Sequence, residues 1–142
     1  MQVETILQSK GAAVHTVTAG APLSEAVRLL NTHKIGAVVV VDGKGQVAGI
    51  LSERDIVRRL ESDPVKLLQS PVHTAMTAKV ITATKAHTVS QLMELMTHHR
   101  IRHIPVVDGN TLVGIVSIGD VVKRKIEETE REALALREYI AS

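Results

Sequence analysis

The sequence predicts an α/β fold built from two copies of one βαββα unit, with a short helix before them and a long helix after them. Residues 14–60 and 80–125 align with a single gap at Gly45, and about 17 of roughly 46 aligned pairs are identical, which indicates an internal duplication. In each copy one segment with helical apolar spacing lies among β-rich runs. A chain of 142 residues is long enough for two such repeats to share a core.

Each copy begins with a short β-rich stretch, at residues 14–17 and 80–83, and continues into an amphipathic helix. In the second copy Thr88 and Gln91 have the spacing of a capping box, and in the first Pro22 stands where an early helical position tolerates it. The buried faces of these helices are expected to consist of Ala26, Val27, Leu29 and Leu30, and of Leu92, Met93, Leu95 and Met96.

Two strands joined by a tight turn follow the helix in each copy. The sequences AVVVVDGKGQVAGIL and HIPVVDGNTLVGIVS both contain Asp-Gly followed by polar residues, which is typical of a β-hairpin. The four valines at 38–41 favour a strand that is buried on both faces. Ser52 and Asp55, and again Ser117 and Asp120, are then spaced as a capping box that opens the last helix of each copy.

These elements divide the chain into five segments. Residues 1–13 form an N-terminal helical segment, 14–61 the first repeat, 62–79 a linker, 80–126 the second repeat and 127–142 a helical extension. The linker contains two prolines and is expected to hold only a short helical turn. Residues 119–140 are rich in Glu, Lys, Arg, Leu and Ala and predict one long helix. Its apolar residues form no clean heptad and suggest a helix that packs on the body or contacts a second copy: Val122, Ile126, Leu134, Leu136 and Ile140.

The composition disfavours several classes of function. There is no Cys, Phe or Trp and Tyr139 is the single tyrosine, so thiolate chemistry and aromatic platforms for single-stranded nucleic acid are missing. The net charge is only +2 and the charges are interspersed, which disfavours a nucleic-acid surface. The sequence shows no signal peptide and no apolar run long enough for a membrane helix, so a cytoplasmic protein without a membrane partner is expected.

The two S-x-x-D motifs have two interpretations. As capping residues, each serine satisfies an N–H group at a helix N-terminus and each aspartate interacts favourably with the helix dipole. As ligand-binding residues, each aspartate accepts hydrogen bonds from the vicinal hydroxyls of a ribose, beside N–H groups that suit an anion. The motif stands at the same place in both repeats, which favours ligand binding without excluding capping.

The other residues that could bind a metal or catalyse a reaction are not spaced as a known metal site or active site. His98, His99 and His103 lie close in sequence, but neighbouring histidines on a helix face different directions and no carboxylate has ligand spacing, so no metal is expected. The sequence has no glycine-rich phosphate loop and no nucleophile with a base and an oxyanion hole, so an enzyme is not expected. His103, beside Arg102, is a candidate either for phosphate contact or for packing.

The segments GILSERDIVRRL and GIVSIGDVVKRK, preceded by KIGAVVVVD and RIRHIPVVD, resemble a tandem pair of cystathionine β-synthase (CBS) domains, the Bateman module, of the stand-alone bacterial type. The pattern is similar to the regulatory module of inosine-monophosphate dehydrogenase and to the nucleotide-sensing subunit of AMP-activated kinase, and it covers residues 14–125. The resemblance implies two repeats packed face to face with pseudo-twofold symmetry around two clefts. It also implies an adenosine ligand whose ribose lies on Asp55 or Asp120, with Ser52 or Ser117 at the hydroxyl position of the motif.

The same resemblance implies where the adenine lies. In the family the ring contacts the apolar residue at the start of the second strand and the first strand of the repeat. These positions correspond to Ile35 and Thr16 in the first repeat, and to Ile101 and Thr82 in the second.

The two clefts are expected to differ in how they bind phosphate. By the same resemblance, Arg102 and Arg54 serve the Asp120 cleft, with His103 close by. Two guanidinium groups suit bidentate phosphate contacts, so this cleft is predicted to bind a phosphorylated ligand better. The corresponding positions for the Asp55 cleft, Gly36 and Gly119, carry no charge. Unless Arg102 or His103 reaches across to it, this cleft is expected to bind a less charged ligand, to bind weakly or to stay empty.

These features predict a non-catalytic sensor. An adenosine nucleotide, AMP, ADP, ATP or NAD(H), is expected to bind between the repeats as a regulatory ligand and to shift their packing, with no metal required. The chain is expected to form a disc-shaped homodimer and to report occupancy to a downstream protein that the sequence does not name. The main alternative is a protein-interaction scaffold with nucleotide-free clefts; a small nucleic-acid binder is disfavoured by the composition.

Overall fold

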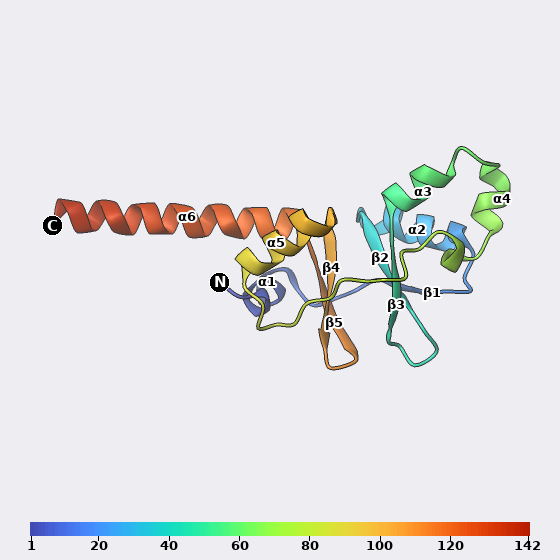
Figure 1. Ribbon diagram of the computed structural model, residues 1–142, viewed down its shortest axis with the longest axis horizontal. Coiled ribbons are helices and arrows are strands. Elements are labelled where there is room, and N and C mark those ends of the chain that lie inside the picture. The colour runs from blue at the N-terminus through green and yellow to red at the C-terminus, as the bar shows by residue number, and fades with distance from the viewer.

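The computed structural model describes all 142 residues and arranges them in two α/β halves, from one of which a long helix projects (Figure 1). The predicted α/β class, short N-terminal helix and long C-terminal helix are confirmed. In chain order the elements are α1 (Val3–Lys10), β1 (Thr16–Thr18), α2 (Leu23–His33), β2 (Ala37–Val41), β3 (Val47–Ser52), α3 (Glu53–Arg59), α4 (Pro64–Gln69), the 3-10 helix η1 (Val72–Thr74), α5 (Val89–His99), β4 (His103–Asp108), β5 (Thr111–Ser117) and α6 (Ile118–Ala141).

The first half contains a three-stranded sheet in the order β1-β2-β3. Strand β1 is parallel to β2, and β2 is antiparallel to β3. The central strand β2 is buried on both faces, with Val38, Val39 and Val40 fully inaccessible to solvent. The valine run therefore forms the buried strand that the sequence predicted.

The second half contains a two-stranded sheet of β4 and β5, and the strand predicted at 80–83 is reduced to one bridge between Ala83 and Val106. The cause is Pro105. In the first half the N–H group of Val39 donates to the carbonyl of His15 at 3.3 Å and extends the β1–β2 pairing. Pro105 occupies the equivalent position and has no N–H group to donate, so the ladder does not continue.

The helices that border the clefts begin at capping boxes. Ser52 and Asp55 cap α3, and Ser117 and Asp120 cap α6 in the same way. In each box the serine side chain accepts from the aspartate N–H group, and the aspartate side chain accepts from the serine N–H group. Each S-x-x-D motif thus fixes the point where its strand ends and its helix begins.

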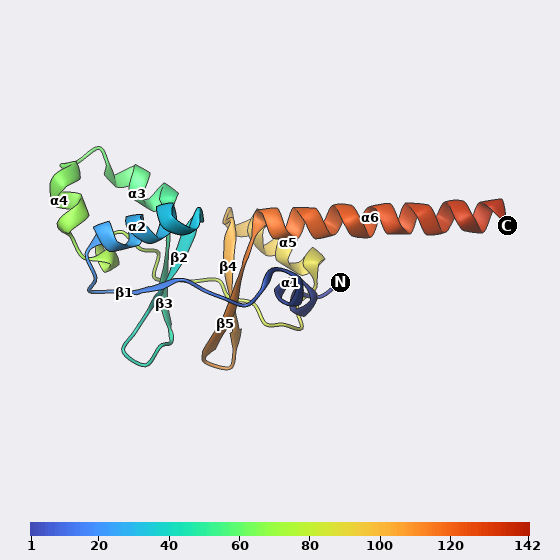
Figure 2. The ribbon, with the colours of Figure 1, turned by 180° about the vertical axis from the view of Figure 1, so that it is seen from behind.

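Each half is completed by a segment that precedes the other half in the chain. Val3, Ile6 and Leu7 of α1 are at most 5% exposed and belong to the core of the second half. Conversely, Leu67 of α4 and Val72 of η1 belong to the core of the first half. After α1 the chain crosses to β1 of the first half (Figure 2). The segment before the first half therefore packs in the core of the second half, and the segment before the second half packs in the core of the first.

Two glycines at equivalent repeat positions lie where these crossing segments pass closest to the strands. A Cβ atom at Gly49 of β3 would lie 2.6 Å from Met76 Sδ and 2.9 Å from the carbonyl oxygen of Thr77. A Cβ atom at Gly114 of β5 would lie 2.6 Å from Leu7 Cδ2. The absence of a side chain at these positions lets α1 and the linker pack directly against the sheets.

Helix α6 contacts the second half only through its first turns. Val121 is fully buried, and Arg124 pairs with Glu127 at 2.9 Å on the adjacent part of the helix. Residues 129–142 are exposed, and this part of α6 projects beyond the body in both views (Figures 1 and 2). The long helix is thus present as predicted, and most of its length packs on nothing in its own chain.

Candidate functional site

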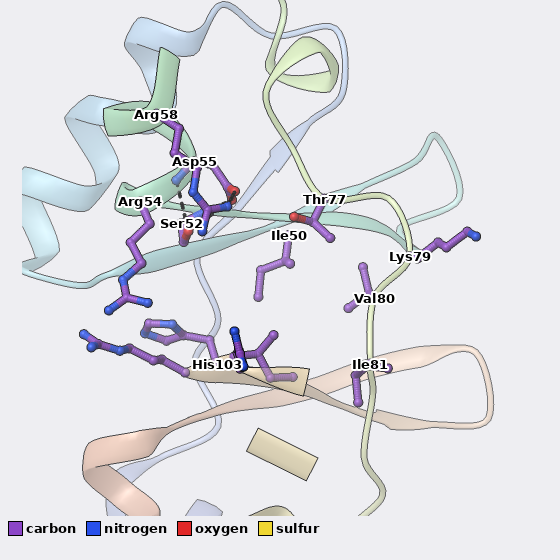
Figure 3. Close-up of a pocket in the computed structure, with 13 residues that line it drawn as sticks. Ile50, Ser52, Arg54, Asp55, Arg58, Thr77, Lys79, Val80, Ile81 and His103 are labelled. Carbon is purple, nitrogen blue, oxygen red and sulfur yellow. Dashed lines mark hydrogen bonds and ion pairs between the residues drawn. The ribbon is translucent and has the colours of Figure 1, made fainter. Parts of the chain in front are cut away.

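A pocket opens between the two halves, and we call it the Asp55 pocket (Figure 3). Its floor is apolar and its rim is basic. The first half contributes β3 and α3, the linker contributes Thr77 and Lys79, and the second half contributes Val80, Ile81 and residues 100–103 at the start of β4. The pocket is lined by Ser52, Asp55 and Thr77, by the apolar residues Ile50, Val80, Ile81 and Ile101, and by the basic residues Arg54, Arg58, Lys79, Arg100, Arg102 and His103.

The capping box positions the Asp55 carboxylate. Asp55 Oδ2 accepts hydrogen bonds from Ser52 N at 2.9 Å and from Ser52 Oγ at 3.1 Å. Asp55 Oδ1 takes no part in the box and lies 3.9 Å from the guanidinium of Arg58, whose side chain is largely exposed. One carboxylate oxygen is therefore held by the helix cap, and the other is free to accept hydrogen bonds from a ligand.

Five permanently cationic residues line the same pocket as this one carboxylate. Arg54 and Arg58 stand one helical turn apart on α3, Lys79 comes from the linker, and Arg100 and Arg102 precede β4. Figure 3 shows the guanidinium of Arg54 extending towards His103 across the pocket. Such an excess of positive charge around a concave, partly apolar surface favours an anionic ligand with an apolar end.

His103 is held against the backbone of the first half. A Cβ atom at Gly36 would lie 3.1 Å from His103 Cε1, so the missing side chain at Gly36 makes room for the imidazole. Burial lowers the pKa of His103 below its usual value; Glu53 opposes this shift, and Lys10 adds to it. His103 is therefore neutral at pH 7 in the ligand-free protein.

Acidification should destabilise the ligand-free protein partly through His103. Its pKa is lowered in the folded state, so below the ordinary value of 6.5 the unfolded chain takes up this proton first. The contribution of His103 to stability is thus complete above pH 6.5 and is lost as the pH falls towards the lowered pKa. Urea unfolding at several pH values should show a steeper decline below pH 6.5 in the wild type than in His103→Gln. Parallel curves for the two proteins would contradict this assignment.

Asp120, the aspartate of the second S-x-x-D motif, already forms an ion pair with Lys10 of the same chain. Lys10 Nζ lies 2.7 Å from Asp120 Oδ2 and also donates to the carbonyl of Ile115 at 3.0 Å. Burial raises the pKa of Asp120, but the hydrogen bonds from Lys10 and Ser117 outweigh this and hold it below its usual value. The Asp120 carboxylate is thus ionised and paired with the last residue of α1.

The predicted site residues do not gather as the sequence suggested. Arg54 and Arg102, assigned to the Asp120 cleft, line the Asp55 pocket. The main chain of Arg102 accepts from Ile118 N at 2.8 Å, so it lies beside the start of α6 although its side chain lines the opposite cleft. Of the remaining residues, Ser52, Asp55, Ile101 and His103 line the Asp55 pocket, whereas five do not: Thr16, Ile35, Thr82, Ser117 and Asp120.

Several pocket residues were missed from the sequence. Arg58 follows Arg54 by four residues, so helical spacing alone was sufficient to place both on one face of α3. Thr77 pairs with Ile50 in an isolated antiparallel bridge, which brings the end of the linker into the site. No pattern in the linker itself signals this pairing.

The comparisons with known proteins agree with the duplication and the fold. The sequence model described as the CBS domain matches residues 10–62 and 72–127. The mitochondrial CBS domain-containing protein CBSX3 of Arabidopsis thaliana is 36% identical over 97% of this chain and 71% of its own length. YhcV of Bacillus subtilis, another CBS domain-containing protein, is 34% identical over 85% of this chain and 86% of its own length.

Solved structures show the same arrangement. A CBS-domain containing protein from Agrobacterium tumefaciens is 45% identical, with a TM-score of 0.83 over 87% of this chain and 92% of its own. A CBS domain pair solved in complex with 5′-methylthioadenosine and S-adenosyl-L-methionine is 27% identical, with a TM-score of 0.80 over 90% and 98%. Inosine-5′-monophosphate dehydrogenase of Methanocaldococcus jannaschii matches over only 22% of its length, at 32% identity and over 79% of this chain.

Two further properties of the structure bear on its class. No helix is both long and apolar enough to span a bilayer. No group of three or more histidine, aspartate or glutamate side chains is arranged to hold a metal ion. With both repeats matched by the family's sequence model and the fold shared with solved CBS pairs, this chain belongs to the CBS domain family.

Proposed function

We propose that this protein is a non-catalytic sensor that binds an adenosine nucleotide in the Asp55 pocket. The observation that carries the proposal is the convergence of five cationic side chains on a pocket with one free carboxylate oxygen and an apolar floor. The solved CBS pair with 5′-methylthioadenosine and S-adenosyl-L-methionine supports an adenosine-bearing ligand. The fit to a purely regulatory module supports the absence of a catalytic role.

The pocket offers a partner for each part of a nucleotide. Asp55 Oδ1 accepts from the ribose hydroxyls while Oδ2 stays in the cap. The adenine contacts the apolar floor formed with Ile101, and the phosphates lie among the basic residues of the rim, with Arg54 and Arg102 as bidentate donors. The charge of the rim favours ligands with two or more phosphates, ATP, ADP or NAD(H), over AMP, and favours AMP over the uncharged thioadenosine.

Ligand binding also supplies a way to signal. The pocket is lined by both halves and by the linker, so a bound nucleotide favours the arrangement of the halves that closes around it. We propose that a second copy of this chain and a downstream protein recognise that arrangement. Exposed apolar residues at the helices that start at the two clefts favour a homodimer: Val57 on α3, Leu60 directly after α3 and Val122 on α6. The cytoplasmic location stays a prediction.

Asp55→Asn should weaken ATP binding by about 10- to 100-fold, because it removes charge-assisted hydrogen bonds of about 1.5–3 kcal/mol to the ribose. The matched control is Asp120→Asn, which changes the equivalent position of the other repeat and should leave the affinity within about twofold. Isothermal titration calorimetry of both variants, with ATP, NAD, AMP and S-adenosylmethionine, measures the difference and the stoichiometry.

Three other results of these titrations would contradict the proposal in different ways. A larger loss in Asp120→Asn would place the ligand at the Asp120 cleft, as the sequence suggested. If no adenosine compound binds the wild type, the protein is a scaffold with nucleotide-free clefts and the sensor proposal fails. Binding of S-adenosylmethionine in preference to ATP would show that the basic rim does not select the ligand.

A further inference from the structure

Helix α6 carries an apolar stripe that its own chain leaves uncovered. Val122, Ile126, Leu136 and Ile140 are 43%, 53%, 60% and 75% exposed. Thr129, also exposed, stands between the first two and the last two. With Ala133 included, successive members of the stripe are separated by four, three, four, three and four residues. This is the spacing of heptad a and d positions, which the five apolar residues alone do not show.

The pattern emerges when two small residues are counted and Leu134 is left out. With about 100° of rotation per residue, the six stripe positions fall within an arc of about 80° on the helix. Leu134 lies about a third of a turn away from the centre of that arc. Thr129 and Ala133 are not strongly apolar, yet they occupy a d and an a position of the same stripe.

The stripe faces away from the rest of the chain. The helix packs on its own body through Val121, Arg124 and Glu128, of which Val121 is fully buried and Glu128 lies beside the N-terminal amine. That packed face is about a third of a turn from the centre of the stripe. A helix from another molecule can therefore lie along the stripe without displacing the contacts of Val121, Arg124 and Glu128.

We propose that α6 pairs in parallel with α6 of a second copy, forming a two-stranded coiled coil along this stripe, which we call the α6 stripe. The charges that flank it specify the orientation. In a parallel pair each g position faces the e position five residues later on the other helix. Lys125 then faces Glu130 of the partner subunit, and Glu132 faces Arg137 of the partner subunit, so both contacts join opposite charges.

The antiparallel alternative brings like charges together. If two stripes overlap completely from Val122 to Ile140 in opposite directions, Glu130 and Glu132 each face their own copies and Lys123 faces Arg137 of the partner subunit. All three contacts are repulsive. In the monomer Lys125 makes two long contacts, to Ser90 Oγ at 3.4 Å and to Glu128 at 3.8 Å, so reaching across a parallel pair replaces only weak interactions.

A single engineered cysteine tests the orientation directly, because the chain has no cysteine of its own. In a parallel pair the two copies of residue 136 face each other, within the Cα separation that a disulfide requires. Leu136→Cys should therefore form a covalent dimer on mild oxidation of the full-length chain at micromolar concentration. The matched control is Leu134→Cys, which is 56% exposed on the same helix but off the stripe, and should remain largely monomeric on a non-reducing gel.

The antiparallel arrangement gives the opposite pattern. There residue 136 faces residue 126, and its own copy lies about 15 Å further along the helix. A mixture of Ile126→Cys and Leu136→Cys would then form a mixed disulfide, while Leu136→Cys alone would not. That result, or equal cross-linking of Leu134→Cys and Leu136→Cys, would overturn the proposal.

Charge reversal provides a second measurement that leaves the core untouched. Arg137→Glu places like charges opposite Glu132 and should raise the dimer dissociation constant about tenfold in sedimentation equilibrium, whereas the double variant Glu132→Arg/Arg137→Glu should return it to the wild-type value. If all three proteins have the same dissociation constant, or if the wild type is a monomer at every concentration tested, α6 does not pair as proposed.

Discussion

Replacing Gly49 by alanine is expected to lower the free energy of unfolding by about 2–3 kcal/mol, because overpacking a tight contact in the core costs this much. The added methyl group would lie 2.9 Å from the carbonyl oxygen of Thr77. That residue cannot shift freely, since its N–H and carbonyl groups both bond to Ile50, at 2.9 and 3.0 Å. The linker would have to detach from β3, and the Asp55 pocket would lose its wall on that side.

Alanine substitutions at two other glycines serve as controls for the loss of stability expected at Gly49. Gly114→Ala should cost about 1–2 kcal/mol, because its contacts are the terminal methyl groups of Leu7, which can yield more easily than backbone. Gly43→Ala should change stability by less than about 0.5 kcal/mol, since a methyl group there meets no atom within 4 Å. Urea unfolding followed by circular dichroism measures all three. Equal effects at Gly43 and Gly49 would show that the linker does not pack on β3 as closely as described.

Ile6→Ala should destabilise the protein by about 3 kcal/mol, the usual cost of truncating a large buried aliphatic side chain. Ile6 is 1% exposed and belongs to the core of the second half, although it stands far from that half in sequence. The loss is measured as the change in the free energy of unfolding in urea at pH 7.5, where His103 and Asp120 contribute fully.

The matched control for Ile6→Ala is Leu134→Ala, a truncation on an exposed helical position off the α6 stripe. Leu134 is 56% exposed, so its removal should alter stability by less than about 0.5 kcal/mol. If Ile6→Ala were as mild as Leu134→Ala, α1 would not be part of the second core. The Lys10–Asp120 pair would then lose the element that positions it.

Much of the fold could be predicted from the sequence because duplication shows each signal twice. The capping boxes, the Asp-Gly turns and the valine run are local patterns, and each one marks an element boundary that the structure contains. The strand at 80–83 was lost for a local reason as well, since Pro105 removes one donor from the ladder. The effect of Pro105 depends on which strand pairs with β4 at that position, and the sequence alone does not specify that strand.

The site could be predicted less well because it depends on contacts between distant segments. The sequence marks Asp55 and Asp120 equally, and only the packing of α1 distinguishes them, through a bond from Lys10 that spans 110 positions. The position of Arg102 depends on packing in the same way: its backbone lies beside the start of α6, whereas its side chain lines the Asp55 pocket. Local motifs identify which residues have binding chemistry, while tertiary packing decides which of them meet.

The exchange of leading segments between the two halves has a consequence for how the protein is synthesised. The backbone of α1 bonds to residues 85 and 87, so its docking closes a loop of more than 80 residues. Until the ribosome has released the second half, Ile6 and Leu7 have no apolar partners to bury them. Contacts of such long sequence separation form late and slowly. The nascent chain thus carries an exposed hydrophobic segment at α1 while the following 80 or so residues are made, and this segment is where chaperone binding or misassembly between chains would begin.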